Sequence, residues 1–170
     1  MRKRANILAL LACTCMAFSP SVAGANDLTR DTIKNRILGR WTVVAITTHV
    51  GARTTSSPVT VHVKDVEPYG SNPKGVLVFE PNGRFTSTLS SSEAAKSAPD
   101  DSNLAALERV SGTYSLHPSR PMVILASGAS DSAKERYVEI TSLTASGLAF
   151  RIVPPPGGTT YSSLSYRRAE

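Results

Sequence analysis

From residue 40 to residue 168, short runs of alternating apolar and polar residues are separated by clusters of turn residues. The runs are rich in Val, Ile, Thr, Phe and Tyr, which favour β-strands. They predict strands at Arg40–Val50, Val59–Val66, Gly75–Phe79, Arg84–Leu89, Ser111–Leu116, Pro121–Ala126, Glu135–Leu143, Leu148–Val153 and Thr160–Arg168. This pattern predicts an all-β sandwich or barrel, and sequential hairpins favour an up-and-down antiparallel β-barrel of about 8–10 strands.

A helical pattern precedes the strands. Ile33 and Ile37 stand one turn apart, and Asn26 or Asp27 can cap a helix, so we expect a short N-terminal helix over Asn26–Leu38.

One long interruption divides the strands, the polar stretch Ser90–Arg109. Leu104 and Leu107 indicate a helical turn within it. Long loops of this kind are typical of lids and binding loops.

The first residues form a separate segment. The basic residues Arg2, Lys3 and Arg4 precede the apolar run Ile7–Phe18, which is too short to span a bilayer as a helix. With the small residues of Ala23–Ala25 after it, this order predicts a secretory signal peptide over 1–25.

Cleavage before Asn26 leaves 26–170 as one domain, exported to the periplasm or outside the cell. In a rival interpretation, Leu10–Cys13 is a loose lipobox, and lipidation of Cys13 anchors the protein to a membrane.

Composition narrows the chemistry of the expected domain. Both cysteines, Cys13 and Cys15, lie in the signal, so residues 26–170 have no disulfide, thiol nucleophile or cysteine metal ligand. Removing residues 1–25 takes away three basic residues and no acidic ones, so the net charge falls from +6 to +3. No basic stripe with aromatic platforms is visible, and we expect no nucleic acid partner.

Five motifs occur in a recognisable order. They are Gly39-Arg40-Trp41, the Gly/Pro-punctuated block Tyr69–Phe85, Ser111-Gly112-Thr113-Tyr114, Arg136-Tyr137 and Leu164–Arg168. Together they resemble the bacterial lipocalin-like domain family of calycin-type barrels over Ile37–Arg168. The segment Gly51–Glu67 is longer than that family's usual first connection, and His117 lies earlier than its common histidine.

The resemblance implies how the barrel is closed. Gly39 lets the chain turn from helix to strand, and the ring of Trp41 plugs the narrow end. An arginine from the last strand packs across that ring. Arg168 shares a face with Leu164 by alternation and is the candidate, with Arg167 as the fallback.

The resemblance also implies a binding site. Inward-facing residues would line a pocket for a small apolar molecule, unless they fill the barrel without a ligand. The candidate lining residues are Leu77, Phe79, Phe85, Tyr114, Arg136, Tyr137, Phe150 and Tyr161.

Catalytic signals are weak. His49, His62 and His117 lack metal-ligand spacing, so we expect no metal and no cofactor. We also expect a monomer without a transmembrane helix. One alternative is a non-metal isomerase, cyclase or hydratase, which needs Tyr114, Arg136 or Tyr137 inside the cavity. A third hypothesis is an envelope interaction protein without a ligand.

Overall fold

The computed structural model describes residues 28–53, 61–90, 104, 107–128, 134–154 and 158–170, without the side chains of 52–53 and 61–63. The expected signal peptide and the proposed caps Asn26 and Asp27 lie outside the described residues. So does most of the middle of Ser90–Arg109.

The described elements are one short helix followed by strands alone. They are α1 (Arg30–Arg36), β1 (Gly39–Arg53), β2 (Val61–Val66), β3 (Lys74–Phe79), β4 (Arg84–Ser90), β5 (Arg109–Leu116), β6 (Met122–Ser127), β7 (Lys134–Leu143), β8 (Gly147–Ile152) and β9 (Tyr161–Arg168). Each predicted strand is present, with ends that differ by a few residues.

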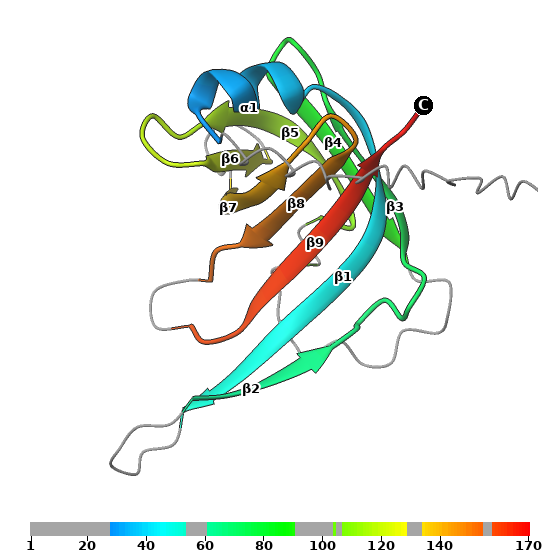
Figure 1. Cartoon of the computed structure of the whole chain (residues 1–170), viewed down its shortest axis with the longest axis vertical. Helices are drawn as coiled ribbons and strands as arrows, with labels where there is room; N and C mark the ends of the chain where they lie inside the picture. Colours follow the sequence, from blue (N-terminus) through cyan, green and yellow to red (C-terminus); the bar gives the residue numbers. More distant parts are fainter. Residues whose placement is uncertain (1–27, 54–60, 91–103, 105–106, 129–133, 155–157) are drawn as a thin grey trace, which may run out of the picture.

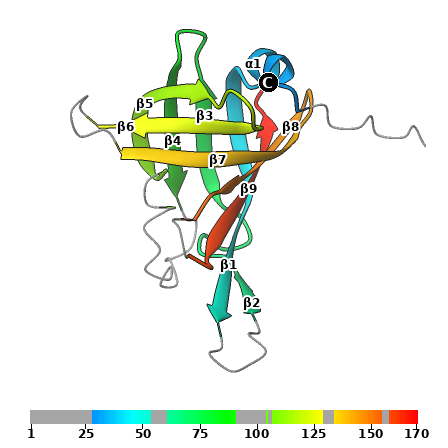
Figure 2. The ribbon, with the colours of Figure 1, turned by 90° about the vertical axis from the view of Figure 1, so that its left-hand side faces the viewer.

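The strands form a closed antiparallel barrel, which confirms the predicted up-and-down architecture (Figure 1). Strands β3 to β9 pair in sequence order, and β1 closes the ring by pairing with both β3 and β9. Eight strands therefore make the barrel. The ninth, β2, pairs only with the distal half of β1, at Thr48–Arg53, and projects beyond the ring (Figure 2).

A β-bulge in β1 decides which side chains face inward. The register against β9 shifts between Val43 and Ala45, and Val44 is 53% exposed. Val43 and Ile46 are both buried on either side of this shift. Inward-facing positions are thus odd before the bulge and even after it, so His49 lies on the outer face.

Helix α1 covers one end of the barrel. It is shorter than predicted and its cap is Thr29, whose side chain accepts a hydrogen bond from the backbone N–H of Thr32. Its expected buried face is confirmed, since Ile33 and Ile37 are each 1% exposed.

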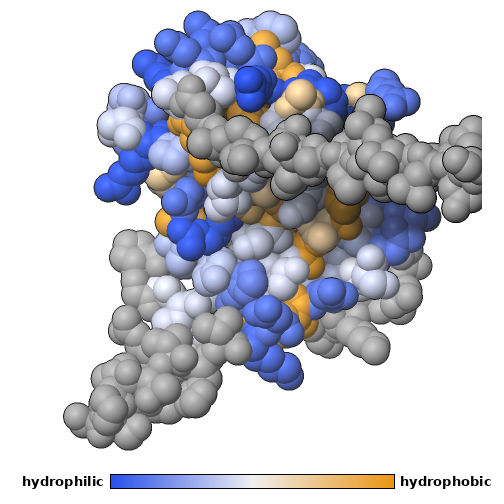
Figure 3. Space-filling view, in the orientation of Figure 1, coloured by the Kyte–Doolittle hydropathy of each residue, from blue (hydrophilic) through white to orange (hydrophobic). Residues whose placement is uncertain are grey.

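The half of the barrel nearest the helix is filled by side chains. Ile37, Phe79, Val123, Leu125, Val138, Ile140, Leu148 and Phe150 surround a space of about 10 Å³. Such a space is no larger than the minimum that one water molecule needs. In the view of Figure 3 the described outer surface is mostly hydrophilic, because the apolar side chains of the strands point into the barrel.

Candidate functional site

The closed end of the barrel is built around Trp41. Its ring is fully buried, and its Nε1–H donates a hydrogen bond to the carbonyl oxygen of Ile37 at 2.7 Å. The guanidinium carbon of Arg168 lies 4.2 Å from the indole centroid, at the distance of a cation–π contact. The side chain that lies over Trp41 is thus that of Arg168.

Arg168 also joins the helix end to the barrel. Its guanidinium donates hydrogen bonds to the carbonyl oxygens of Arg36 (2.6 Å), Leu38 (2.8 Å) and Ala145 (2.8 Å). The first is one of the carbonyls that a helix leaves without an internal partner at its C-terminal end, and the second belongs to the link into β1. Gly39 follows with a φ of +110°, a conformation that L side chains rarely adopt, and turns the chain into β1.

Four of the expected lining residues are buried apolar side chains in the interior: Leu77, Phe79, Phe85 and Phe150. Tyr114 also packs against the core, edge-on to Phe79 with ring centroids 4.9 Å apart. Its hydroxyl donates a hydrogen bond to the carbonyl oxygen of Glu80 at 3.0 Å, and burial raises its pKa. Tyr114 is therefore engaged in the packing near the helix end.

Arg136 lies on the inner face of β7. It stands directly opposite Leu125 of β6, which is 3% exposed, and cross-strand partners share a face. The Nε atom of Arg136 is buried and has no hydrogen-bond partner in the described structure.

The expectation that Tyr137 and Tyr161 line the interior is corrected by the register. Tyr137 is 42% exposed, while the next residue, Val138, faces inward. The hydroxyl of Tyr137 donates to Glu135, and this hydrogen bond raises its pKa. Tyr161 stacks on His49 on the outer face. In each strand the adjacent residue, Val138 or Ser162, is buried instead, because successive side chains of a strand point to opposite faces.

The interior also contains polar groups that the sequence did not reveal. Tyr166 is 3% exposed, and its hydroxyl has no hydrogen-bond partner among the described residues. Burial, and then the nearby Tyr69, raise the pKa of Tyr166. Because a buried hydroxyl without a partner lowers the free energy of unfolding by about 1–3 kcal/mol, the unpartnered hydroxyl of Tyr166 needs an explanation.

Tyr69 lies close to Tyr166 but is paired. Its hydroxyl donates to the Glu108 carboxylate at 2.6 Å, and burial followed by this hydrogen bond raises its pKa. Nearby, Ser87 donates to the carbonyl oxygen of Leu107 at 2.7 Å. These contacts join the segment before β5 to the barrel wall.

Two more buried hydroxyls lie on the inner face of β1 and β9. Thr48 and Ser162 are 1% and 2% exposed, and their oxygens are 2.9 Å apart. The interior is therefore apolar at the helix end and more polar toward the opposite end.

The described residues contain no cluster of three or more His, Cys, Asp or Glu side chains that could hold a metal ion. No helix within the described ranges is long and apolar enough to cross a membrane. No protein-family model matches the sequence, and no curated protein matches it. The lipocalin-like resemblance therefore rests on the motifs and on the closed barrel, which is compatible with a calycin-like fold.

Proposed function

We propose that this chain is an exported lipocalin-like protein whose barrel binds a small, largely apolar molecule that carries one hydrogen-bond-accepting group. The closed barrel supports this proposal, because antiparallel barrels of about eight strands are wide enough for one small ligand. The inner face supplies apolar contacts, and few charged groups approach it.

The observation that carries the proposal is the hydroxyl of Tyr166. It is a buried donor without an acceptor in the described structure, on a side chain that stacks on Phe150 at 5.3 Å between ring centroids. A ligand oxygen at this hydroxyl would remove the cost of leaving it unsatisfied. The apolar part of the ligand would contact the neighbouring rings.

We place the ligand beside the Tyr166 hydroxyl, on the side of Tyr69, because the space among Phe79, Leu125 and Phe150 is filled by side chains. Arg136 offers a second buried donor on the inner face, its Nε. The Arg136 guanidinium can only donate and is positively charged, so it favours a ligand with a carboxylate or carbonyl group over an amine.

The enzyme hypothesis has less support. Of the three residues that it needs, Tyr137 faces outward and Tyr114 is bonded to a backbone carbonyl. Only Arg136 remains, and an arginine is always protonated, so it provides no acid–base pair. An interaction protein with a filled barrel is the outcome if no ligand is found.

Export is supported by the order of basic, apolar and small residues before Asn26. It is also consistent with a domain that has no cysteine after that point and needs no disulfide.

Binding is tested by calorimetric titration with decanoic acid and with decane, which lacks the accepting group. We expect decanoic acid to bind and Tyr166→Phe to weaken its binding by about tenfold, the equivalent of one lost hydrogen bond. Tyr114→Phe is the matched control, since its hydroxyl already has a partner, and should bind as the parent does. Equal affinity of the parent and Tyr166→Phe would contradict the proposed role of Tyr166.

A further inference from the structure

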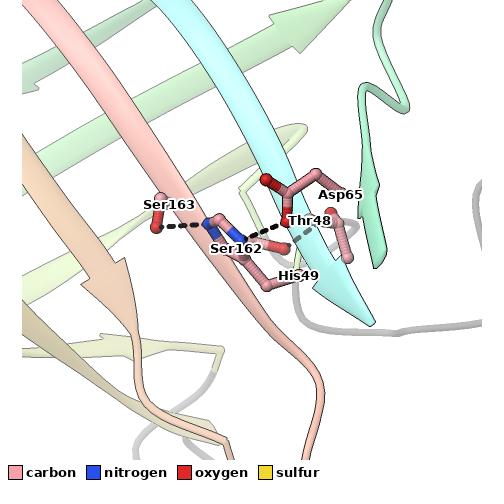
Figure 4. Close-up of polar contacts among 5 residues, drawn as sticks. All are labelled: Thr48, His49, Asp65, Ser162 and Ser163. Carbon is pink, nitrogen blue, oxygen red and sulfur yellow. Dashed lines mark hydrogen bonds and ion pairs between the residues drawn. The ribbon is translucent and has the colours of Figure 1, made fainter. Parts of the chain in front are cut away.

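A second cluster lies on the outer face, where β2, β1 and β9 run side by side (Figure 4). His49 of β1 stands directly opposite Asp65 of β2, and its Nδ1 lies 2.7 Å from the Asp65 carboxylate. Its Nε2 lies 3.2 Å from the Oγ of Ser163 on β9. The imidazole thus bridges a carboxylate and a serine hydroxyl.

For a neutral imidazole, hydrogen-bond chemistry sets the direction of these contacts. An ionised carboxylate only accepts, so Nδ1 carries the proton of the neutral ring and donates to Asp65. Nε2 then has a free lone pair and accepts from the hydroxyl of Ser163. This is the order of groups, serine then histidine then carboxylate, that activates a serine nucleophile.

One neighbour stacks on the ring, and a cationic residue stands opposite the serine in the register. Tyr161 stacks on His49 with ring centroids 4.5 Å apart. Arg151 of β8 stands directly opposite Ser163, and its guanidinium lies 5.4 Å from the Tyr161 centroid. Arg151 also pairs with Glu139.

We propose that Ser163, His49 and Asp65 form a nucleophilic site that takes an acyl group from an activated ester and passes it to water. The site is independent of the ligand proposed for the barrel interior, because these side chains lie on the outside of the wall. His49 and Asp65 are 20% and 63% exposed, so solvent and substrate reach them.

In the first step, the Oγ of Ser163 attacks the acyl carbon while its proton passes to Nε2 of His49. The carbonyl electron pair moves to the oxygen, and Arg151 on the neighbouring strand is the cation opposite Ser163. When the carbonyl forms again, the bond to the leaving alcohol breaks, and that alcohol takes the proton from Nε2. Water then attacks acyl-Ser163 in the same way, which releases a carboxylic acid and restores the hydroxyl.

The position of Ser163 limits the substrates. It lies within a strand that pairs on both sides, not at the strand-to-helix turn whose backbone N–H groups form an oxyanion hole. Arg151 is the only cation that the register places opposite it, and Glu139 shares that cation. We therefore infer aryl esters and similar acyl donors with good leaving groups, not amides.

The test is labelling of the full chain with a fluorophosphonate probe, located by peptide mass mapping, together with release of p-nitrophenol from p-nitrophenyl acetate. We expect the label at Ser163 and its loss in Ser163→Ala. Removal of the base in His49→Gln should lower the labelling rate at least ~100-fold. Ser165→Ala is the matched control, because Ser165 shares the strand and face but stands opposite Ala45 and Ala149.

Asp65 is a positioning residue, so its variants separate orientation from folding. Asp65→Asn should slow labelling at least ~10-fold and Asp65→Glu should restore part of the rate, with circular dichroism confirming that each variant is folded. No label on the parent, or a label on Ser163 that is unchanged in His49→Gln, would overturn the proposal.

Discussion

The guanidinium carbon of Arg168 lies 4.2 Å from the centre of the Trp41 ring, while its nitrogens bond three backbone carbonyls. The first strand and the last strand are thereby fastened at one end of the barrel, where Trp41 and Arg168 are direct partners in the register. The pair is a structural device, because the Trp41 N–H and the Arg168 guanidinium are both engaged with backbone carbonyls.

Replacing Arg168 should therefore destabilise the barrel without affecting ligand binding directly. Arg168→Met keeps an apolar stem over Trp41 but removes the charge and the donors. We expect the free energy of unfolding to fall by about 2–4 kcal/mol, from lost charged hydrogen bonds and the cation–π contact. Urea denaturation measures it. Arg167→Met, at the exposed neighbour, should change stability by less than about 0.5 kcal/mol, and equal effects of both variants would refute this role.

Gly112 should tolerate no side chain. A Cβ at this position would overlap the carbonyl oxygen of Ala126 on β6 and press on the ring of Phe85. Gly112→Ala should therefore lower the free energy of unfolding by about 1–3 kcal/mol, as overpacking of a core does. At Gly83 a Cβ would meet only the carbonyl oxygen of Tyr114, at 3.7 Å, so Gly83→Asn, which accepts a positive φ, should cost less. Thermal melts of both variants compare the two positions.

The buried tyrosines predict a loss of stability at high pH. In the folded state the pKa values of Tyr69 and Tyr166 are raised above the ordinary value of 10.0, chiefly by burial. The unfolded chain therefore releases these protons first. Their contribution is fully present below pH 10 and falls as the pH rises further, by about 1.4 kcal/mol per pH unit for each tyrosine.

Tyr166→Phe separates the two tyrosines. It removes one proton from the linkage, so the fall of stability above pH 10 should become shallower by about 1.4 kcal/mol per pH unit. It also removes an unsatisfied buried hydroxyl, so the variant should be more stable than the parent at pH 7, by about 1 kcal/mol. Chemical denaturation at several pH values measures both effects. A Tyr166→Phe variant with the parental slope would show that Tyr166 ionises in the folded state as readily as in the unfolded one.

Export is tested by the mass of the mature protein. Expressed with its own N-terminus in a bacterium, the chain should accumulate in the periplasm with Asn26 as its first residue. A product that begins with a lipidated Cys13 would support the anchored form instead, and an uncleaved chain in the cytoplasm would contradict both.

The barrel was predictable because period-two alternation and turn residues act locally, and each predicted strand is present. The pair of Trp41 with an arginine followed from the resemblance, and alternation selected Arg168. The same alternation places Tyr161 on the face opposite Leu164, so its outward direction was predictable. The direction of Tyr137 was not, since a shift of one residue turns every side chain to the other face.

The two polar clusters were also invisible in the sequence. His49 and Ser163 are separated by 114 positions, and only the β1–β9 pairing brings them together. The bulge after Val43 then turns His49 outward toward Asp65. Tyr166 carries no signal that its hydroxyl is buried without a partner, because that depends on residues from other strands.

The most direct test of the central claim is native mass spectrometry of the full chain purified from a bacterial host, before any ligand is added. A small molecule should leave the parent protein on activation, and the occupied fraction should be much lower in Tyr166→Phe but unchanged in Tyr114→Phe. A parent protein that carries no small molecule in repeated preparations, and that takes up none from a host lipid extract, would contradict the account and favour a filled barrel that acts through its surface.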